Sequence, residues 1–152
     1  MSSAATPLLY LEDLEPGEVG TFGSYRTTEA EIVEFSERYN PLPYHLAEAD
    51  ESGPFGGMIA TGWQTGAIMM RLAADHWTGK METLGGTGVD ARFHAPVRAG
   101  DELRLKIDVT DVTPSERDPT RGTVRWQGTL FNQDDARVMT CDIVMRVSRR
   151  PA

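Results

Sequence analysis

The chain has 152 residues, which is the size of one domain rather than two. Charged residues make up 25% of it and hydrophobic residues 39%, and together with 15 glycines this composition excludes a disordered chain, a collagen-like repeat and a disulfide scaffold. The 23 acidic residues outnumber the 15 lysines and arginines, which gives a formal net charge of −8. A global basic surface is therefore absent, and we expect neither nucleic acid nor a membrane as a partner.

Residues 1–7 carry neither the basic start nor the apolar core of a secretory signal, and we expect this segment to be disordered. Cys141 is the only cysteine and cannot form an internal disulfide, which is typical of a reducing compartment. The most apolar stretch, residues 57–74, is interrupted by polar side chains and favours a buried helix over a membrane span. The sequence thus predicts one cytoplasmic domain over residues 1–152.

The first elements are a weak strand over residues 19–27 and a helix after it. Thr28 is predicted to be the N-cap of this helix, and Glu31 stands where it would complete a capping box. The apolar face of the helix is formed by residues at helical spacing: Ile32, Phe35 and, as a further candidate, Tyr39. The two prolines within residues 40–43 end the helix.

A short helical turn is predicted over residues 46–51, followed by a glycine-rich loop over residues 52–57. The longest helix is predicted from about Ile59 to His76. Gly62 and Gly66 lie four residues apart and therefore share one face of this helix. We interpret that face as a place where a sheet approaches the helix backbone closely.

The second half of the chain predicts a β-meander. Strands are expected at four segments with alternating hydrophobicity: residues 88–95, 102–113, 122–131 and 138–147. Between residues 103 and 109 apolar and polar side chains alternate strictly, so one face of that strand is buried and the other is wet. A long helix followed by antiparallel strands in one small domain predicts an α+β fold with the helix packed on the sheet.

Few residues of the sequence are candidates for a catalytic or metal-binding role. The three histidines, at positions 45, 76 and 94, lack the spacing of metal ligands, and neither a phosphate-binding loop nor a serine nucleophile motif is present. We therefore expect no metal and no organic cofactor. Cys141 falls within a predicted strand and is interpreted as an inert core thiol. His45 follows Pro41 and Pro43 in a rigid segment; it is either a structural histidine or the best general acid/base candidate, because imidazole titrates nearest to neutral pH.

Three ordered segments make the sequence similar to a known family. They are YNPLPYHL at residues 39–46, FGGMIATGW at residues 55–63 and FHAPVRAGD at residues 93–101. In this order they resemble the MaoC-like acyl dehydratase family, which includes the (R)-specific enoyl-CoA hydratases. The resemblance runs from about residue 12 to residue 147, which is nearly the whole chain.

The resemblance implies a single hotdog domain, in which an antiparallel sheet wraps around a long central helix. It also implies a homodimer or higher homo-oligomer, with a tunnel for an acyl thioester at or near the interface. The thioester would be carried by coenzyme A or by an acyl-carrier protein. The helix predicted over residues 59–76 would be the central one.

The same resemblance suggests the site residues. His45 matches the family's histidine, and Gly62 matches the glycine whose backbone N–H polarises the thioester carbonyl. Asn40 stands where the family has an aspartate. Residues assigned to substrate binding are Trp63, which would line the acyl tunnel or pack in the core, together with Gly57 and Arg92. Arg92 would belong to a cationic rim for phosphates, although a charged strand face is more often simply solvated.

Asn40 is the important departure, because a carboxamide cannot accept a proton at neutral pH. Three interpretations stay open: His45 acts alone while Asn40 positions water; Glu37, Glu48 or Asp90 supplies the carboxylate; or the protein binds acyl thioesters without hydrating them. The predicted function is an acyl-thioester hydratase/dehydratase that interconverts 2-enoyl and 3-hydroxyacyl groups. The alternatives are a non-catalytic acyl-thioester-binding protein and, less favoured, a thioesterase.

Overall fold

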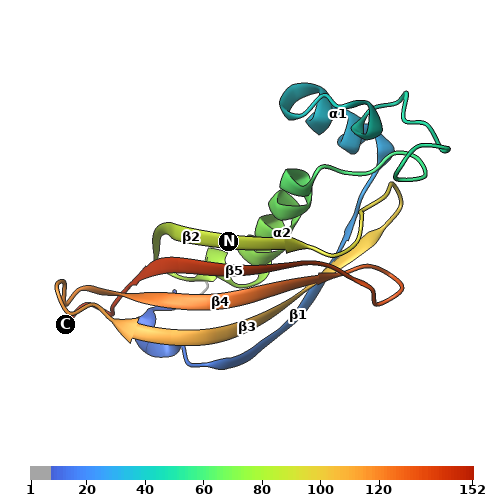
Figure 1. Ribbon diagram of the computed structural model, residues 1–152. Coiled ribbons are helices and arrows are strands. Elements are labelled where there is room, and N and C mark those ends of the chain that lie inside the picture. The colour runs from blue at the N-terminus through green and yellow to red at the C-terminus, as the bar shows by residue number, and fades with distance from the viewer. Residues whose placement is uncertain (1–7) are drawn as a thin grey trace, which may run out of the picture.

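Five antiparallel strands form one sheet in the order β1-β3-β4-β5-β2, and two α-helices accompany it (Figure 1). The computed structural model describes residues 8–152, so the expectation that residues 1–7 are disordered lies outside the described residues. Within that range the helices and strands are β1 (Gly17–Arg26), α1 (Glu29–Tyr39), α2 (Gly62–His76), β2 (Thr83–Phe93), β3 (Glu102–Pro114), β4 (Arg121–Phe131) and β5 (Arg137–Ser148).

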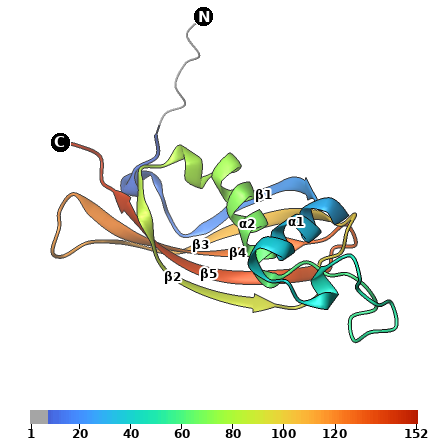
Figure 2. The same cartoon turned by 90° about the horizontal axis from the view of Figure 1, so that it is seen from above.

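The sheet curves around α2, which lies across one of its faces, while α1 lies near one end of the sheet (Figures 1 and 2). The buried face of α2 contributes Ile68, Met69 and Leu72 to a core that also contains the inward side chains of β3, β4 and β5. This arrangement is the α+β hotdog fold that the sequence predicts. No helix within residues 8–152 combines the length and the hydrophobicity needed to cross a bilayer.

Strand β3 shows how the sequence pattern produces the sheet. Leu103, Leu105 and Ile107 are fully buried, whereas Arg104 and Lys106 between them remain partly exposed. Because successive side chains of a strand point to opposite faces, this alternation fixes the register of β3 against both neighbours. The four strands predicted in the second half are confirmed, although β2 begins at Thr83, five residues before the predicted start.

Helix α1 starts at the predicted cap. The Thr28 hydroxyl accepts a hydrogen bond from the Glu31 backbone N–H at 3.2 Å. The reciprocal half of the capping box is not made, because the Glu31 carboxylate accepts from the Tyr25 hydroxyl instead. Burial and this hydrogen bond raise the pKa of Tyr25 to about 12. Ile32 is fully buried as predicted, but Tyr39 is 64% exposed, so its proposed place in the apolar face is wrong.

Two helix boundaries differ from the predictions. Helix α2 begins at Gly62 rather than Ile59, because the Ile59 N–H donates to the Tyr44 carbonyl at 3.0 Å and the Ala60 N–H donates to the Val97 carbonyl at 2.8 Å. These long-range bonds hold the segment extended. The helical turn predicted over residues 46–51 is reduced to one hydrogen-bonded turn, in which the Ala49 N–H donates to the Leu46 carbonyl at 3.0 Å. A 3-10 segment precedes it at Pro43–His45, with proline in its first position.

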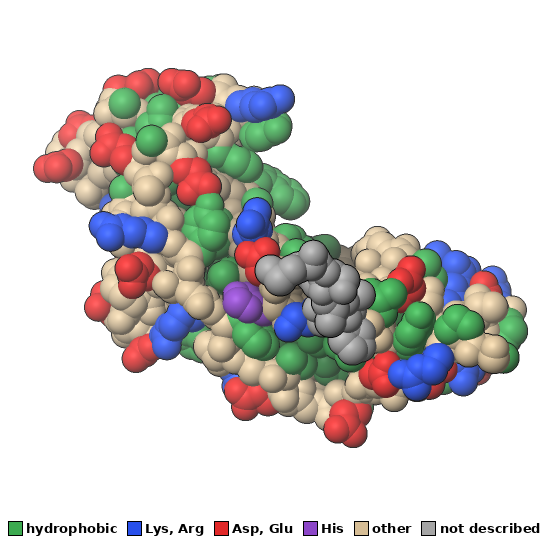
Figure 3. All heavy atoms as spheres, turned by 180° about the vertical axis from the view of Figure 1, so that it is seen from behind, with side chains coloured by type: hydrophobic (Ala, Val, Ile, Leu, Met, Phe, Trp, Pro, Cys, Tyr) green, Lys and Arg blue, Asp and Glu red, His purple; other side chains and the backbone are tan. Residues whose placement is uncertain are grey.

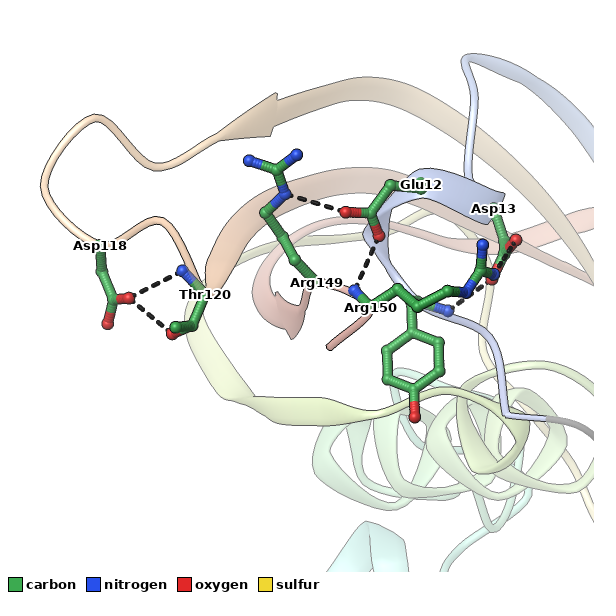
Figure 4. Close-up of polar contacts among 7 residues, drawn as sticks. Glu12, Asp13, Asp118, Thr120, Arg149 and Arg150 are labelled. Carbon is green, nitrogen blue, oxygen red and sulfur yellow. Dashed lines mark hydrogen bonds and ion pairs between the residues drawn. The ribbon is translucent and has the colours of Figure 1, made fainter. Parts of the chain in front are cut away.

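The two ends of the described chain are joined by ion pairs at one end of the sheet (Figure 4). Arg149 Nε donates to Glu12 at 2.9 Å, the Arg150 N–H donates to the same carboxylate at 3.0 Å, and the Arg150 guanidinium donates to Asp13 at 2.6 Å. The hydrogen bond from Arg149 is the largest cause that lowers the pKa of Glu12 to about 2. We call Glu12, Asp13, Arg149 and Arg150 the terminal clamp.

Candidate active site

A cavity of about 1100 Å³ lies between α2 and the strands β2 and β5. Its lining is mainly apolar, and no Asp, Glu, Lys or Arg of residues 8–152 contributes to it. Hydrophobic side chains also gather in the hollow of the molecular face drawn in Figure 3. The polar side chains that line the cavity are those of His45, Thr65 and His94. Such a cavity suits an apolar ligand that carries few polar groups.

His45 is buried, with 5% of its surface exposed, and it lies at the end of the 3-10 segment Pro43–His45. Its Nδ1 is 2.7 Å from the Ile59 carbonyl oxygen, and its ring meets the Tyr44 ring edge-on at 4.5 Å. A carbonyl oxygen only accepts hydrogen bonds, so Nδ1 carries the proton and Nε2 keeps its lone pair. The local fold therefore selects the tautomer in which Nε2 of the neutral ring is the proton acceptor.

Asn40 is the C-cap residue of α1, and its side chain reaches the N-cap residue of α2. Asn40 Nδ2 donates to the Thr61 hydroxyl at 3.1 Å, and Thr61 is 2% exposed. Asn40 does not line the cavity. Its carboxamide therefore links the two helices.

Gly62 lines the cavity at the first position of α2. The Thr61 hydroxyl makes no cap for this helix, and the amide groups of Gly62 and Trp63 have no acceptor among the described residues. Free N–H groups at the positive end of a helix favour an oxyanion. A Cβ at position 62 would come within 2.6 Å of the Phe93 ring, so the close approach of that ring accounts for glycine here.

The three predicted substrate-binding residues lie in different places. Trp63 lines the cavity and is 79% exposed. Gly57, with a φ of +123°, lies in the loop before α2 but does not line the cavity. Arg92 points to the opposite face of β2, where its Nε lies 3.3 Å from the Asp90 carboxylate. The structure thus brings Trp63 together with His45 and Gly62, and it separates Arg92 from them.

None of the carboxylates considered as replacements for the missing aspartate reaches the cavity. Glu37, Glu48 and Asp90 are exposed, and Asp90 is paired with Arg92. Within residues 8–152 no group of three or more His, Cys, Asp or Glu side chains is arranged to hold a metal ion. Among the described residues, the basic side chains that line the cavity are therefore the imidazoles of His45 and His94.

Sequence reasoning missed most of the strand residues that line the cavity. Ala91 of β2 and Met139, Cys141 and Ile143 of β5 all point inward. Residues 89–93 of β2 alternate between apolar and charged side chains. This pattern predicts that Ala91 and Arg92 point to opposite faces of the strand, and it could have identified Ala91 as an inward residue. Burial is the main cause that raises the pKa of the Cys141 thiol to about 11, in agreement with the predicted inert thiol.

Comparison with known proteins defines the class. Residues 14–128 match the MaoC like domain, so the chain belongs to the MaoC-like dehydratase family. The chain is 30% identical over 112 residues to a 3-hydroxybutyryl-CoA dehydratase of Methylorubrum extorquens, covering 72% of this chain and 69% of that one.

Solved structures agree with this assignment. The crystal structure of a MaoC-like dehydratase from Rhodospirillum rubrum is 33% identical, with a TM-score of 0.84 and coverage of 95% of this chain and 99% of that one. An (R)-hydratase from A. caviae involved in PHA biosynthesis is 26% identical, with a TM-score of 0.68 and coverage of 92% and 99%. The chain is thus similar to a solved dehydratase and a solved hydratase over more than nine tenths of its length.

Proposed function

We propose that this protein is an acyl-thioester hydratase/dehydratase that interconverts 2-enoyl and 3-hydroxyacyl thioesters of coenzyme A or an acyl-carrier protein. The observation that carries this proposal is that His45 and Gly62 line the same apolar cavity. The bond from His45 Nδ1 to the Ile59 carbonyl leaves Nε2 as the proton acceptor of the neutral ring, and the Gly62 N–H has no acceptor among the described residues. The family membership and the dehydratase relatives support the same class of reaction.

The proposed mechanism uses one imidazole for both proton transfers. The thioester oxygen accepts a hydrogen bond from the Gly62 N–H, which stabilises the enolate charge that develops there. His45 Nε2 takes a proton from water while the hydroxyl oxygen bonds to Cβ. The imidazolium then returns that proton to Cα, so that one water is added and His45 is again neutral. Dehydration runs the same steps backwards.

In this mechanism Asn40 is a positioning residue. Its hydrogen bond to Thr61 joins the end of α1 to the start of α2, and the Thr61 hydroxyl that accepts this bond makes no cap to the first helical turn. Of the three interpretations left open by the sequence, we favour a form of the first, in which His45 acts alone but Asn40 joins the two helices instead of positioning water. The exposed positions of Glu37, Glu48 and Asp90 support this choice.

The first experiment replaces His45 with alanine and follows the loss of enoyl-thioester absorbance. Removal of a general acid/base residue is expected to lower the rate by roughly 10²- to 10⁴-fold. His76→Ala is the matched control, because His76 stacks on Phe22 with ring centroids 5.1 Å apart and does not line the cavity. Unchanged activity of a folded His45→Ala variant would remove His45 from the mechanism.

A non-catalytic acyl-thioester-binding protein is the second candidate, favoured by the fact that no carboxylate of residues 8–152 lines the cavity. In this case an enoyl thioester mixed with excess protein would bind without any loss of its absorbance. Hydration would instead remove the conjugated double bond and the absorbance with it. Release of free coenzyme A from a saturated acyl-CoA would indicate a thioesterase.

We also propose that the protein forms a homodimer through the open side of the cavity. Large apolar side chains are exposed on α2 and on β2, which is an edge strand of the sheet: Trp63, Met70, Leu84, Val89 and Phe93. An unpaired strand edge beside exposed apolar residues favours association with a second chain. Sedimentation at micromolar concentration is expected to give twice the chain mass, and a monomer would contradict this assembly.

A further inference from the structure

Two buried polar side chains have no hydrogen-bond partner among residues 8–152. Ser36 of α1 is fully buried, and Gln64 of α2 is 3% exposed. The Ser36 hydroxyl and both polar atoms of the Gln64 carboxamide, Nε2 and Oε1, lack a donor or acceptor in this part of the chain. Buried polar groups in native proteins are usually hydrogen-bonded to the chain or to ordered water. These three atoms therefore need a partner that the described chain does not supply.

Both residues lie close to the hydrogen bond between Asn40 and Thr61. Ser36 lies four residues before Asn40 and shares a face of α1 with it. Gln64 lies three residues after Thr61 and shares a face of α2 with it. At ~1.5 Å per residue these separations correspond to about 6 Å along α1 and about 4.5 Å along α2. Ser36 and Gln64 are therefore each about one helical turn from the same contact.

One turn beyond Ser36 and Gln64, the same two helix faces are apolar. Ile32 lies four residues before Ser36, and Ile68 lies four residues after Gln64. Both isoleucines are buried and belong to one hydrophobic core cluster. The unpartnered polar residues thus lie between a polar contact of the two helices on one side and the core on the other.

The partner of these side chains is small. Neither Ser36 nor Gln64 lines the cavity, so a substrate in the cavity or a second copy on its open side does not reach them. Their burial within one chain also leaves no access for a larger ligand. A hydroxyl and a carboxamide together offer donors and acceptors, which matches a water molecule with two to four polar partners.

We propose that Ser36 and Gln64 bind buried water between α1 and α2, and that Gln64 is thereby a positioning residue for the first turn of α2. The Asn40–Thr61 bond and the water would then hold the start of α2 from two neighbouring turns. That first turn carries the Gly62 amide, which has no acceptor among the described residues. The positioning role rests on the proposed function, whereas the water site does not.

Nuclear magnetic resonance tests the water site in the unaltered protein. Buried water stays long enough beside an amide to transfer magnetisation to it, so the side-chain NH₂ of Gln64 is expected to show a nuclear Overhauser effect to water. Gln127 provides the comparison, because its NH₂ donates to Asp142 at 3.2 Å on the exposed face of the sheet. Absence of any effect at Gln64 would overturn the water site, and this measurement requires no variant to fold.

Gln64→Met provides a test by stability, because methionine has a similar shape and no amide. If Gln64 binds water, its removal leaves that water and the Ser36 hydroxyl without a partner, and Tm is expected to fall by about 2–8 °C. If the carboxamide is instead buried without any partner, the same substitution removes an unfavourable group and raises Tm. A rise in Tm would therefore refute the proposal.

A double-mutant cycle tests whether the two residues share the water. Gln64→Met is expected to lower Tm less in a Ser36→Ala background than in the parent, because the water is lost only once. The helix propensity of alanine is present in both proteins of that comparison and cancels. Leu72→Met is the matched control, since Leu72 is buried on α2 about 12 Å beyond Gln64 and is expected to give the same shift in both backgrounds. An equal effect of Gln64→Met in both backgrounds would overturn the shared site.

Enzyme kinetics test the positioning role. Displacement of the Gly62 N–H from the thioester oxygen is expected to lower kcat of Gln64→Met on the order of tenfold with little change in KM, whereas Leu72→Met keeps both. Unchanged kcat would reject the positioning role and keep the water site. If the parent protein hydrates no enoyl thioester, the proposed function fails, while the resonance and unfolding results still decide the water site.

Discussion

Gly128 of β4 allows α2 to lie directly on the sheet, and Gly128→Ala is expected to destabilise the protein. A Cβ at this position would come within 2.8 Å of Met69 Sδ, 3.1 Å of the Trp126 ring and 3.2 Å of a Leu105 methyl group. Optimal contacts between non-bonded carbon atoms are ~3.5–4.0 Å. Overpacking of this kind lowers the free energy of unfolding by about 1–3 kcal/mol. Replacing glycine by alanine also restricts the unfolded chain, which raises the free energy of unfolding by about 0.4–1 kcal/mol. The expected net loss is therefore on the order of 1–2 kcal/mol.

The assay is urea or thermal unfolding followed by circular dichroism. For a chain of this size each kcal/mol lowers Tm by about 2–4 °C. Gly88→Ala is the matched control, since its Cβ would meet the nearest atom of Val144 at an ordinary 3.7 Å. This control is expected to be neutral or slightly stabilising. A Gly128→Ala variant as stable as Gly88→Ala would refute the idea that the helix and sheet are in close contact at Gly128.

Three further predictions concern other parts of the structure. Thr61→Val removes the acceptor for Asn40 and is expected to cost about 0.5–1.5 kcal/mol in urea unfolding, with Thr61→Ser close to the parent; equal values for the two would contradict the helix bridge. The pKa of Glu12 is lowered to about 2 in the folded state, so its stabilising contribution is present above its ordinary value of 4.5 and is lost as the pH falls towards 2. Glu12→Gln is therefore expected to flatten the dependence of Tm on pH in this range, and an unchanged slope would exclude Glu12 as its source. Cys141, with a pKa of about 11, is expected to resist alkylation at pH 8 until the protein is denatured, which mass spectrometry would show; rapid labelling of the folded protein would contradict its burial.

The fold was predictable from local pattern. Alternation in β3 and the cap at Thr28 are properties of neighbouring residues, and both are confirmed. The start of α2 was not predictable in this way, because residues 59–61 have helical periodicity but are held extended by bonds to Tyr44 and Val97. Contacts between segments so distant in the sequence leave no periodic signal in either segment.

The residues of the candidate site were also predictable from the sequence, whereas part of its geometry was not. The resemblance identified His45 and Gly62, and the structure places both on one cavity. The tautomer of His45 depends on the Ile59 carbonyl, and a backbone atom of this kind has no signature in the sequence. The outward direction of Arg92 follows from its position in β2 and could have been read from the alternation with Ala91 and Phe93.

The uncapped start of α2 limits the stability of the protein against heat. A threonine cap usually stabilises a helix by about 1 kcal/mol, but the hydroxyl of Thr61 accepts from Asn40 and caps nothing. The first two amides of the helix therefore stay free for a ligand, and the helix lacks the stabilisation that a cap would add. Selection for heat resistance alone is expected to favour variants in which residue 61 caps the Trp63 N–H, so that one of the two amides is no longer free.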